Sequence, residues 1–230
     1  MSGERVRTIV VVGGVAGGMS CAARARRLDE SAEIIVLERG EHVSFANCGL
    51  PYYVGGEIAD AAALLVQTPQ SLRSALNLDV RTGHEVTGVD PARKVVTVRT
   101  GSGHHEIRYD ALVLSPGAAA IRPAIPGIDS ALVHTVRSVE DAVGLRAEVD
   151  ARPAGRAVVL GAGFIGLEVA EALAAQGMAV SVVELAAHVL PPLEREVAHD
   201  VEVELRGLGI AVHTGVPATA IEAVADHALI

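Results

Sequence analysis

Residues 161–166 read GAGFIG, and the stretch around them decides the fold that the sequence predicts. The apolar run 156–160 precedes this turn, and a helical pattern follows it to about Gln176. A strand, a G-x-G-x-x-G turn and a helix together form the dinucleotide-binding fingerprint, in which the pyrophosphate lies at the helix N-terminus. A second strand, residues 180–183, ends in Glu184, where an acid accepts hydrogen bonds from ribose hydroxyls. The pattern therefore predicts a nucleotide-binding unit.

An earlier part of the chain repeats this arrangement. A buried strand is predicted over residues 5–12, GGVAGG follows at 13–18, and a helix comes next. The strand predicted over residues 33–37 ends at Glu38. Val15 occupies the middle glycine position, so a turn that merely joins strand to helix stays an alternative. With Glu38 in register, we favour a second dinucleotide site.

Composition narrows the class of protein. The chain has 230 residues, of which 50% are hydrophobic and only 2% aromatic, which is typical of parallel sheets covered by helices. A net charge of −9 argues against a nucleic-acid partner. No apolar run reaches the roughly 20 residues that span a membrane, and residues 1–8 contain no signal peptide. Two cysteines in this context predict a reducing, cytoplasmic setting.

One cysteine lies in a distinctive stretch, SFANCGLPYY at residues 44–53. Asn47 is a favourable N-cap residue, and Pro51 is tolerated in a first helical turn, so we place Cys48 at the start of a short helix. The unpaired N–H groups at that end favour a thiolate, the form that attacks disulfides. A buried structural cysteine is the alternative. Cys21 lies in an Ala-rich helix and is interpreted as a packing residue.

The first predicted helix carries polar residues along one face. Ser20, Arg24 and Arg27 follow at spacings of four and three, whereas Arg26 lies on another face. Such a face is usually a solvated charged surface. The functional alternative is a phosphate clamp beside Cys48, and spacing alone does not decide between them.

Further elements follow from periodicity and turn residues. Ser138 is expected to cap a helix over residues 139–150, with Asp141 in its first turn. The predicted helices cover residues 69–76, 139–150 and 194–208. The predicted strands cover residues 86–89, 95–99 and 106–109 as a meander, then 111–114 and 210–213. Residues 218–230 are expected to start another meander.

Two fingerprints with a lone cysteine between them form a specific constellation. On these motifs the sequence resembles the pyridine nucleotide–disulfide oxidoreductases of the single-cysteine branch, and it is most similar to coenzyme A disulfide reductases, rhodanese-fused forms included. NADH oxidases and NADH peroxidases are close relatives of that branch. The resemblance rests on residues 11–40, SFANCGLPYYVGG at 44–56, LSPGA at 114–118 and VVLGAGFIGLEVAEAL at 158–173.

The resemblance implies an α/β fold with two Rossmann-like domains of the glutathione-reductase-like type. Residues 1–125 would form the N-terminal part of an FAD-binding domain with the redox cysteine, 126–150 a connector, and 151–230 an incomplete NAD(P)-binding domain. The family continues with a segment that closes the FAD site and a dimerisation domain. We therefore expect a homodimeric parent protein and poor activity of these residues alone. A nucleotide- or CoA-binding module without turnover is an alternative.

The resemblance also implies site residues. Glu184 would bind the NAD(P)H ribose, and the absence of Arg and Lys from residues 185–188 favours NADH over NADPH. The FAD-binding residues would be Gly13, Val15, Ala16, Gly18, Glu38, Arg39, Val86 through its backbone, Ser115 and Gly117. The other NAD(P)H-binding residues would be Gly161, Gly163, Phe164, Ile165 and Gly166, and the coenzyme A-binding residues would be Ser20, Arg24, Arg27, Ser44 and Asn47. No metal is expected.

The implied activity passes electrons from NAD(P)H through FAD to a Cys48–S–S–CoA mixed disulfide. The freed Cys48 thiolate would then attack CoA disulfide and restore the mixed disulfide. Val43 and Tyr53 stand where C-x4-C relatives would place a second cysteine, so no redox disulfide is expected around Cys48. The peroxidase relatives carry a catalytic histidine in the first glycine turn. Residues 13–18 contain no histidine, which argues against a peroxidase. An NADH oxidase that cycles Cys48 through a sulfenic acid, and a CoA persulfide or polysulfide reductase, remain alternatives.

Overall fold

The chain forms two compact units. The computed structural model describes residues 6–224 and 227–229. The first unit comprises residues 1–46 and 65–118, and the second comprises residues 47–64 and 119–230. Within the described ranges no helix is long and apolar enough to cross a membrane.

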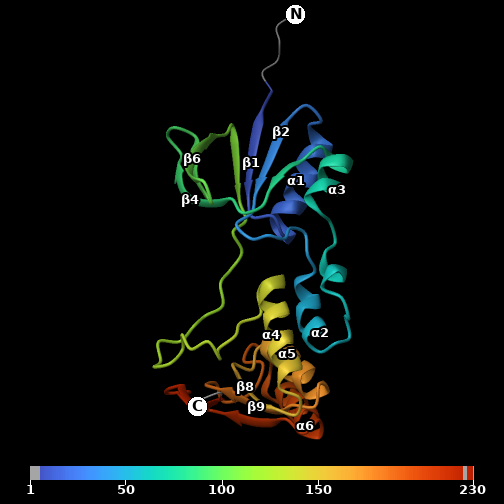
Figure 1. Ribbon diagram of the computed structural model, residues 1–230, viewed down its shortest axis with the longest axis vertical. Coiled ribbons are helices and arrows are strands. Elements are labelled where there is room, and N and C mark those ends of the chain that lie inside the picture. The colour runs from blue at the N-terminus through green and yellow to red at the C-terminus, as the bar shows by residue number, and fades with distance from the viewer. Residues whose placement is uncertain (1–5, 225–226, 230) are drawn as a thin grey trace, which may run out of the picture. The chain divides into compact units, whose positions relative to one another are not determined.

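A four-stranded parallel sheet forms the centre of the first unit (Figure 1). Its order is β3-β2-β1-β7, with β1 at Thr8–Val12, β2 at Glu33–Leu37, β3 at Asp79–Arg81 and β7 at Ala111–Leu114. The chain moves outward from β1 to β3 and then returns to the other side of β1 as β7. The carboxyl end of β1 therefore lies at the point where the strand order reverses, which is where open α/β sheets bind ligands.

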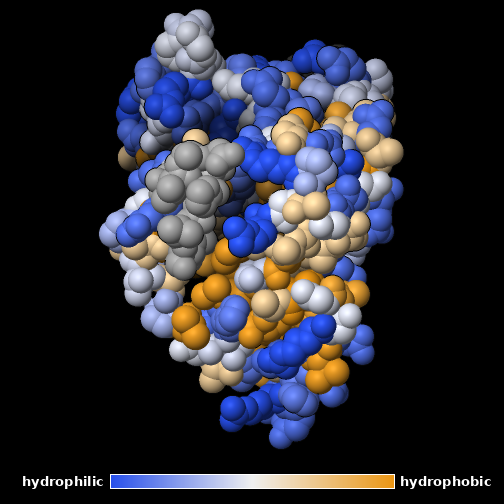
Figure 2. Space-filling view, turned by 60° about the horizontal axis from the view of Figure 1, so that its bottom comes forward, coloured by the Kyte–Doolittle hydropathy of each residue, from blue (hydrophilic) through white to orange (hydrophobic). Residues whose placement is uncertain are grey.

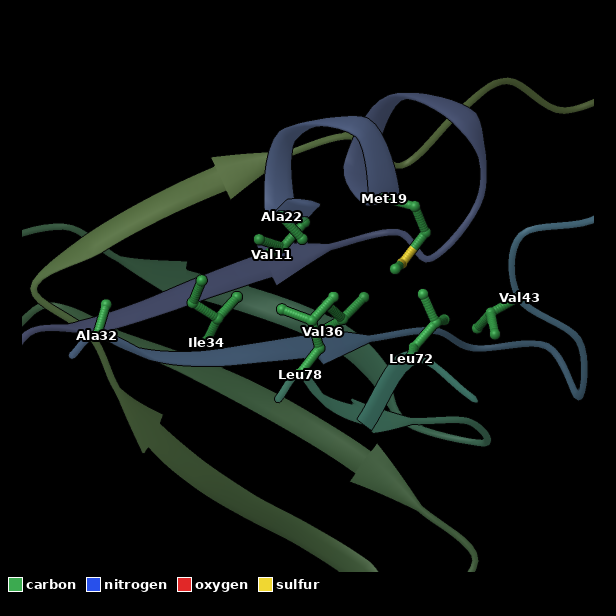
Figure 3. Packing of buried hydrophobic residues seen from close by; sticks show 9 residues of the cluster. All are labelled: Val11, Met19, Ala22, Ala32, Ile34, Val36, Val43, Leu72 and Leu78. Atoms are coloured by element: carbon green, nitrogen blue, oxygen red, sulfur yellow. The ribbon is translucent and has the colours of Figure 1, made fainter. Parts of the chain in front are cut away.

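One face of this sheet packs against helices. Helix α1 (Ala16–Leu28) and helix α3 (Pro69–Leu76) contribute Met19 and Leu72 to a cluster with side chains from β1 and β2. Figure 3 shows these side chains converging between the strands and α1. The strand residues in this cluster are Val11, Ile34 and Val36.

The opposite face packs against an antiparallel sheet. Strands β4 (Glu85–Asp90), β5 (Val95–Thr100) and β6 (Gly103–Arg108) form the predicted meander. Val96 and Val98 of β5 cluster with the intervening residues of the parallel strands, Val10, Ile35 and Leu37. Because successive side chains of a strand point to opposite faces, burial on both faces explains the continuous apolar runs in the sequence.

Arg26 connects three segments of the first unit. It is 8% exposed and is the only buried charged residue among those whose burial is described. Its guanidinium donates five hydrogen bonds to the backbone carbonyls of Asp29, Glu30, Ala32, Leu76 and Asn77. These contacts satisfy terminal carbonyls of α1 and α3, which explains why this arginine departs from the exposed face of α1.

The second unit contains its own parallel sheet. Strands β8 (Arg156–Leu160), β9 (Ala179–Glu184) and β10 (Ala211–Thr214) occur in the order β10-β9-β8. Helix α5 (Phe164–Ala175) packs on β8 and β9, and helix α6 (Arg195–Gly207) packs on β10. The buried residues between helix and strands include Leu167, Ala170, Leu173, Val180 and Val182.

Other segments complete the second unit. Helix α4 (Val139–Ala151) begins with the predicted cap, a capping box between Ser138 and Asp141. The 3-10 helix η1 (Asn47–Gly49), helix α2 (Leu50–Val54) and the 3-10 helix η2 (Ala61–Leu64) also belong here. Strands β11 (Glu222–Val224) and β12 (His227–Leu229) pair antiparallel. Part of the meander predicted over 218–230, residues 225–226 and 230, lies outside the described residues. The predicted α/β class with parallel sheets is confirmed.

Candidate nucleotide and thiol sites

The first glycine turn joins β1 tightly to α1. Gly13 has φ +99°, and its N–H donates to the carbonyl of Leu37 over 2.8 Å. A Cβ at Gly13 would lie 1.9 Å from the carbonyl oxygen of Ser115, and one at Gly18 would lie 1.8 Å from the carbonyl oxygen of Gly13. These backbone approaches exclude any side chain. The turn therefore brings Gly13, Gly18 and Ser115, all predicted FAD-binding residues, together at the carboxyl edge of the sheet.

Glu38 holds this turn with both carboxylate oxygens. Its Oε2 accepts from the N–H of Gly14 over 2.7 Å, and its Oε1 accepts from the N–H of Gly40 over 2.9 Å. The carboxylate thus lies at the glycine turn, where an acid recognises ribose hydroxyls. The two N–H donors have no sequence signature and were not predicted.

The second glycine turn repeats the backbone conformation and the hydrogen bonds of the first, although a Cβ at Gly161 would meet no atom within 4 Å. Gly161 has φ +99° and donates to the carbonyl of Val183 over 2.8 Å. Glu184 accepts from the N–H of Ala162 over 2.6 Å and from that of Ala186 over 2.7 Å. Two independent segments of the chain therefore form the same turn-and-carboxylate arrangement, one in each unit.

The second turn also leaves room for a ligand. A Cβ added at Gly163 would meet no atom within 4 Å, so no protein contact requires a glycine at this position. A close approach by a pyrophosphate would require one. Phe164 and Ile165 begin α5 and are 60% and 58% exposed. Figure 2 shows hydrophobic surface gathered in the lower half of the face in view. The residues present fit a dinucleotide at the N-terminus of α5.

A hollow of about 600 Å³ lies in the first unit, beside α1 and α3. It brings together three residues of the predicted coenzyme A set, namely Ser20, Arg27 and Ser44. Arg24 is exposed on α1 and does not line the hollow. The rest of the lining consists of Met19, Ala23, Gln67, Leu72, Ala75 and Leu76, and its α3 side was not predicted.

Ser44 connects this hollow to the first glycine turn through its backbone. Its N–H donates to the carbonyl of Gly14 over 2.8 Å, and its carbonyl accepts from Val66 and Gln67 over 2.9 and 3.3 Å. Its φ of +47° is unusual for a residue other than glycine. These three hydrogen bonds hold Ser44 in the left-handed region, a type of strain that is common at functional sites.

Cys48 is an exposed free thiol in the second unit. It lies in η1, directly before α2, and Pro51 is in the first turn of α2 as predicted. The predicted N-cap is wrong: Gly49 occupies the N-cap of α2, and Asn47 lies within η1, because a 3-10 turn precedes the helix. The other thiol, Cys21, is half-buried on α1, in agreement with a packing role.

The remaining predicted residues are distributed over other segments. Val15 is the N-cap of α1, and Ala16 is the exposed first residue of that helix. Arg39 is exposed after β2, Gly117 has φ +71°, and Val86 packs in the cluster between the two sheets of the first unit. Their roles toward a cofactor stay predictions. No cluster of metal ligands occurs in the part of the chain that the structure describes.

Each of the two glycine turns has a carboxylate that accepts hydrogen bonds from its backbone. This arrangement places the chain in the class of proteins with two dinucleotide-binding folds. Comparison of residues 7–229 with family models matches pyridine nucleotide-disulphide oxidoreductase, and the chain belongs to that family. The family implies FAD and a pyridine nucleotide as cofactors.

Individual relatives narrow the comparison. The coenzyme A disulfide reductase of Staphylococcus haemolyticus is 41% identical over 180 residues, which cover 77% of this chain and 40% of that protein. The structure of reduced CoADR-RHD from Bacillus anthracis superposes with a TM-score of 0.91 at 43% identity, over 95% of this chain and 40% of that one. An NAD-dependent persulfide reductase from A. fulgidus gives 0.91 at 40% identity, over 96% of this chain and 42% of its own. The chain thus spans less than half the length of these relatives.

An oxidase is also similar. The water-forming NADH oxidase of Lactobacillus brevis, bound to NADH, has a TM-score of 0.90 at 30% identity, over 96% of this chain and 49% of that one. An engineered NADPH oxidase derived from it is bound to NADPH and carries five substitutions. These include an aspartate replaced by alanine and the next residue, an alanine, replaced by arginine.

We predict that Gly166→Ala destabilises the second unit whereas Gly163→Ala does not. A Cβ at residue 166 would lie 2.1 Å from the carbonyl oxygen of Gly161, so α5 would have to shift. The free energy of unfolding should fall by about 2–3 kcal/mol, against less than about 1 kcal/mol for Gly163→Ala. Urea unfolding followed by circular dichroism measures both. Equal stability of the two variants would show that the backbone approach is not the constraint.

Proposed function

We propose that this chain provides the nucleotide-binding and thiol-bearing part of an FAD-dependent NADH oxidoreductase that reduces CoA disulfide through Cys48. The observation that carries the proposal is the exposed Cys48 in a chain with two carboxylate-braced glycine turns. Identities near 40% to a coenzyme A disulfide reductase and to CoADR-RHD support it.

The chemistry proposed for Cys48 is thiol–disulfide exchange. The bound FAD and NADH would together supply two electrons and a proton. With them the Cys48–S–S–CoA disulfide is cleaved to a Cys48 thiolate and one CoA thiol. The thiolate attacks one sulfur of CoA disulfide, forms the mixed disulfide again and expels the second CoA as its thiolate, which takes up a proton. The exposure of Cys48 lets a substrate as large as CoA disulfide reach the sulfur.

The hollow beside α1 and α3 supports coenzyme A as the thiol carrier. Arg27 is exposed at its wall and supplies a guanidinium, which pairs well with phosphate oxygens. Ser20 and Ser44 supply hydroxyl groups, while Met19 and Leu72 supply apolar surface. A ligand with phosphates at one end and an uncharged arm suits this mixture. The proposed coenzyme A residues beyond the hollow are Arg24 and Asn47.

NADH is the proposed electron donor. Glu184 ends β9 at the second glycine turn, where a carboxylate accepts ribose hydroxyls and repels a 2′-phosphate. In the engineered NADPH oxidase, the substituted glycine precedes the substituted aspartate by 18 residues, as Gly166 precedes Glu184 here. The same spacing supports Glu184 as the residue that discriminates between the two nucleotides.

A persulfide reductase is the second candidate. The A. fulgidus enzyme is named an NAD-dependent persulfide reductase and is 40% identical to this chain. Cys48 would then attack a persulfide instead of CoA disulfide. Comparison of CoA disulfide, CoA persulfide and oxygen as oxidants of the NADH-reduced protein identifies the acceptor.

Cys48→Ser should separate the two half-reactions. Flavin reduction by NADH, followed under argon by loss of the visible flavin band, should stay within about twofold because Cys48 does not receive the hydride. Turnover with CoA disulfide should fall by about 1000-fold or more, since removal of a nucleophile abolishes the covalent route. Cys21→Ser is the matched control and should keep both rates. Retention of CoA-disulfide turnover by Cys48→Ser would refute the proposed role.

Arg27→Met should raise the KM for CoA disulfide by about tenfold or more, since a lost charge-assisted hydrogen bond costs about 1.5–3 kcal/mol. The kcat should change little if Arg27 acts in binding alone. Arg73→Met, on α3 but outside the hollow, is the control and should leave both constants unchanged. An unchanged KM of Arg27→Met for CoA disulfide would show that the hollow is not part of the substrate site. Turnover with oxygen should not respond to either substitution.

Glu184→Ala combined with Leu185→Arg should move the preference toward NADPH. The change removes the charge that repels the 2′-phosphate and adds a cation beside it, so the ratio of kcat/KM for the two nucleotides should shift by about 100-fold. It should also lower stability by about 1–2 kcal/mol, because the N–H groups of Ala162 and Ala186 lose their acceptor. Leu185→Arg alone keeps both hydrogen bonds and is the control. A parent protein that already prefers NADPH would contradict the assignment.

A further inference from the structure

The short helix after the thiol is anchored in the second unit. Helix α2 packs against both α4 and α5 (Figure 1). Leu50 is 2% exposed and Val54 is 0% exposed, whereas Cys48, just before them, is exposed. The buried side chains hold α2 in place while the thiol remains outside. The position of the sulfur therefore depends on how α2 is seated on these two helices.

The end of α2 approaches α5 at backbone distance. A Cβ at Gly55 would lie 3.1 Å from the Cβ and 3.2 Å from the Cα of Ala172, which is buried on α5. Gly56 follows with φ +79° and turns the chain away. A Cβ there would lie 2.8 Å from Nη1 of Arg146 and 3.1 Å from Nε2 of Gln176. Glycine and alanine thus allow the end of α2 to lie close to α5, with the polar side chains of Arg146 and Gln176 beside it.

Those two side chains bind the carbonyl groups at the end of α2. Nη1 of Arg146 on α4 donates to the carbonyl of Tyr53 over 3.3 Å, and Nε2 of Gln176 at the end of α5 donates to the carbonyl of Gly55. The last carbonyls of a helix have no partner within the helix. The carbonyl of Tyr53 also accepts from the N–H of Gly56 over 3.1 Å, so Arg146 is an additional donor to it, whereas Gln176 binds the carbonyl of Gly55 just beyond the helix. Asp150 accepts from Nε of Arg146 over 2.8 Å and orients the guanidinium. A cation at a helix C-terminus is also favoured by the helix dipole.

We propose that Arg146 and Gln176 are positioning residues for Cys48, which act by fixing the C-terminal end of α2. This inference rests on the proposed role of Cys48 in disulfide exchange. Neither residue is placed at the thiol; each acts through the backbone of α2. The attacking sulfur must approach its target disulfide in a defined geometry, and a misplacement of about 1 Å can cost about 100-fold in rate. The contacts of Arg146 and Gln176 with the end of α2 therefore affect the disulfide step and leave nucleotide binding at the start of α5 unchanged.

The test compares Arg146→Met and Gln176→Met with Arg152→Met in the flavin-loaded protein. Arg152, the C-cap residue of α4, is a matched control because it also forms an i,i+4 ion pair with an acid of α4, Glu148. Stopped-flow absorption measures flavin reduction by NADH and, separately, the CoA-disulfide step. Hydrogen–deuterium exchange measures the opening of residues 50–56. Arg146→Lys keeps a donor and a charge, so it should recover part of the lost rate.

The expected result is a split between the two half-reactions. In Arg146→Met and Gln176→Met, flavin reduction stays within about twofold while the disulfide step slows by at least about tenfold. Amide exchange over residues 50–56 becomes faster in both variants and not in Arg152→Met. A disulfide step and an exchange pattern equal to those of Arg152→Met would overturn the inference. Equal slowing of both half-reactions would overturn it as well, because that result indicates general destabilisation.

Failure of the proposed function has a different signature. The parent protein and Arg152→Met would then both lack CoA-disulfide turnover. The exchange measurement needs no substrate, so it still decides whether Arg146 and Gln176 hold α2. Normal amide exchange over residues 50–56 in both methionine variants would by itself overturn the inference that Arg146 and Gln176 hold α2.

Discussion

In each unit a helix approaches the glycine turn before it at backbone distance. The Cβ missing from Gly18 would lie 1.8 Å from the carbonyl oxygen of Gly13, and that missing from Gly166 would lie 2.1 Å from that of Gly161. Without these side chains each helix begins directly at the carboxyl edge of its sheet. Its first N–H groups then face the space beyond the strands, where a pyrophosphate binds. The two predicted nucleotide sites thus depend on how closely the helix and its turn approach each other.

A carboxylate accepts hydrogen bonds at each turn, so the same group stabilises the turn and lies where ribose recognition is predicted. Glu38 and Glu184 each accept two backbone N–H groups, one from the glycine turn and one from just beyond the strand. Each acid is therefore held by its own turn in the position where we predict that it accepts ribose hydroxyls. The residue proposed to discriminate between NADH and NADPH, Glu184, therefore also stabilises its own turn. A change of specificity and a change of stability are physically coupled at this position.

Local signals predicted most elements of the fold. Strand β2, strand β8 and helix α3 match the predicted ranges, because apolar runs, turn residues and proline act over a few residues. The N-cap before α2 was predicted wrongly, since Asn47 has the right chemistry but an extra 3-10 turn separates it from the helix. The α3 side of the hollow was not predicted, because Gln67 and Leu72 approach α1 only in the folded chain.

The sequence by itself determined that two strand–turn–helix fingerprints, each followed by an acid, flank a lone cysteine. Those features are local, so spacing and residue type reveal them. The tertiary structure decided which distant segments meet. It placed Cys48 and α2 with α4 and α5, joined Arg26 to the carbonyls after α3, and brought Ser20 and Ser44 to one hollow. Contacts between residues far apart in the chain have no periodic signature, and therefore only the folded structure could show them.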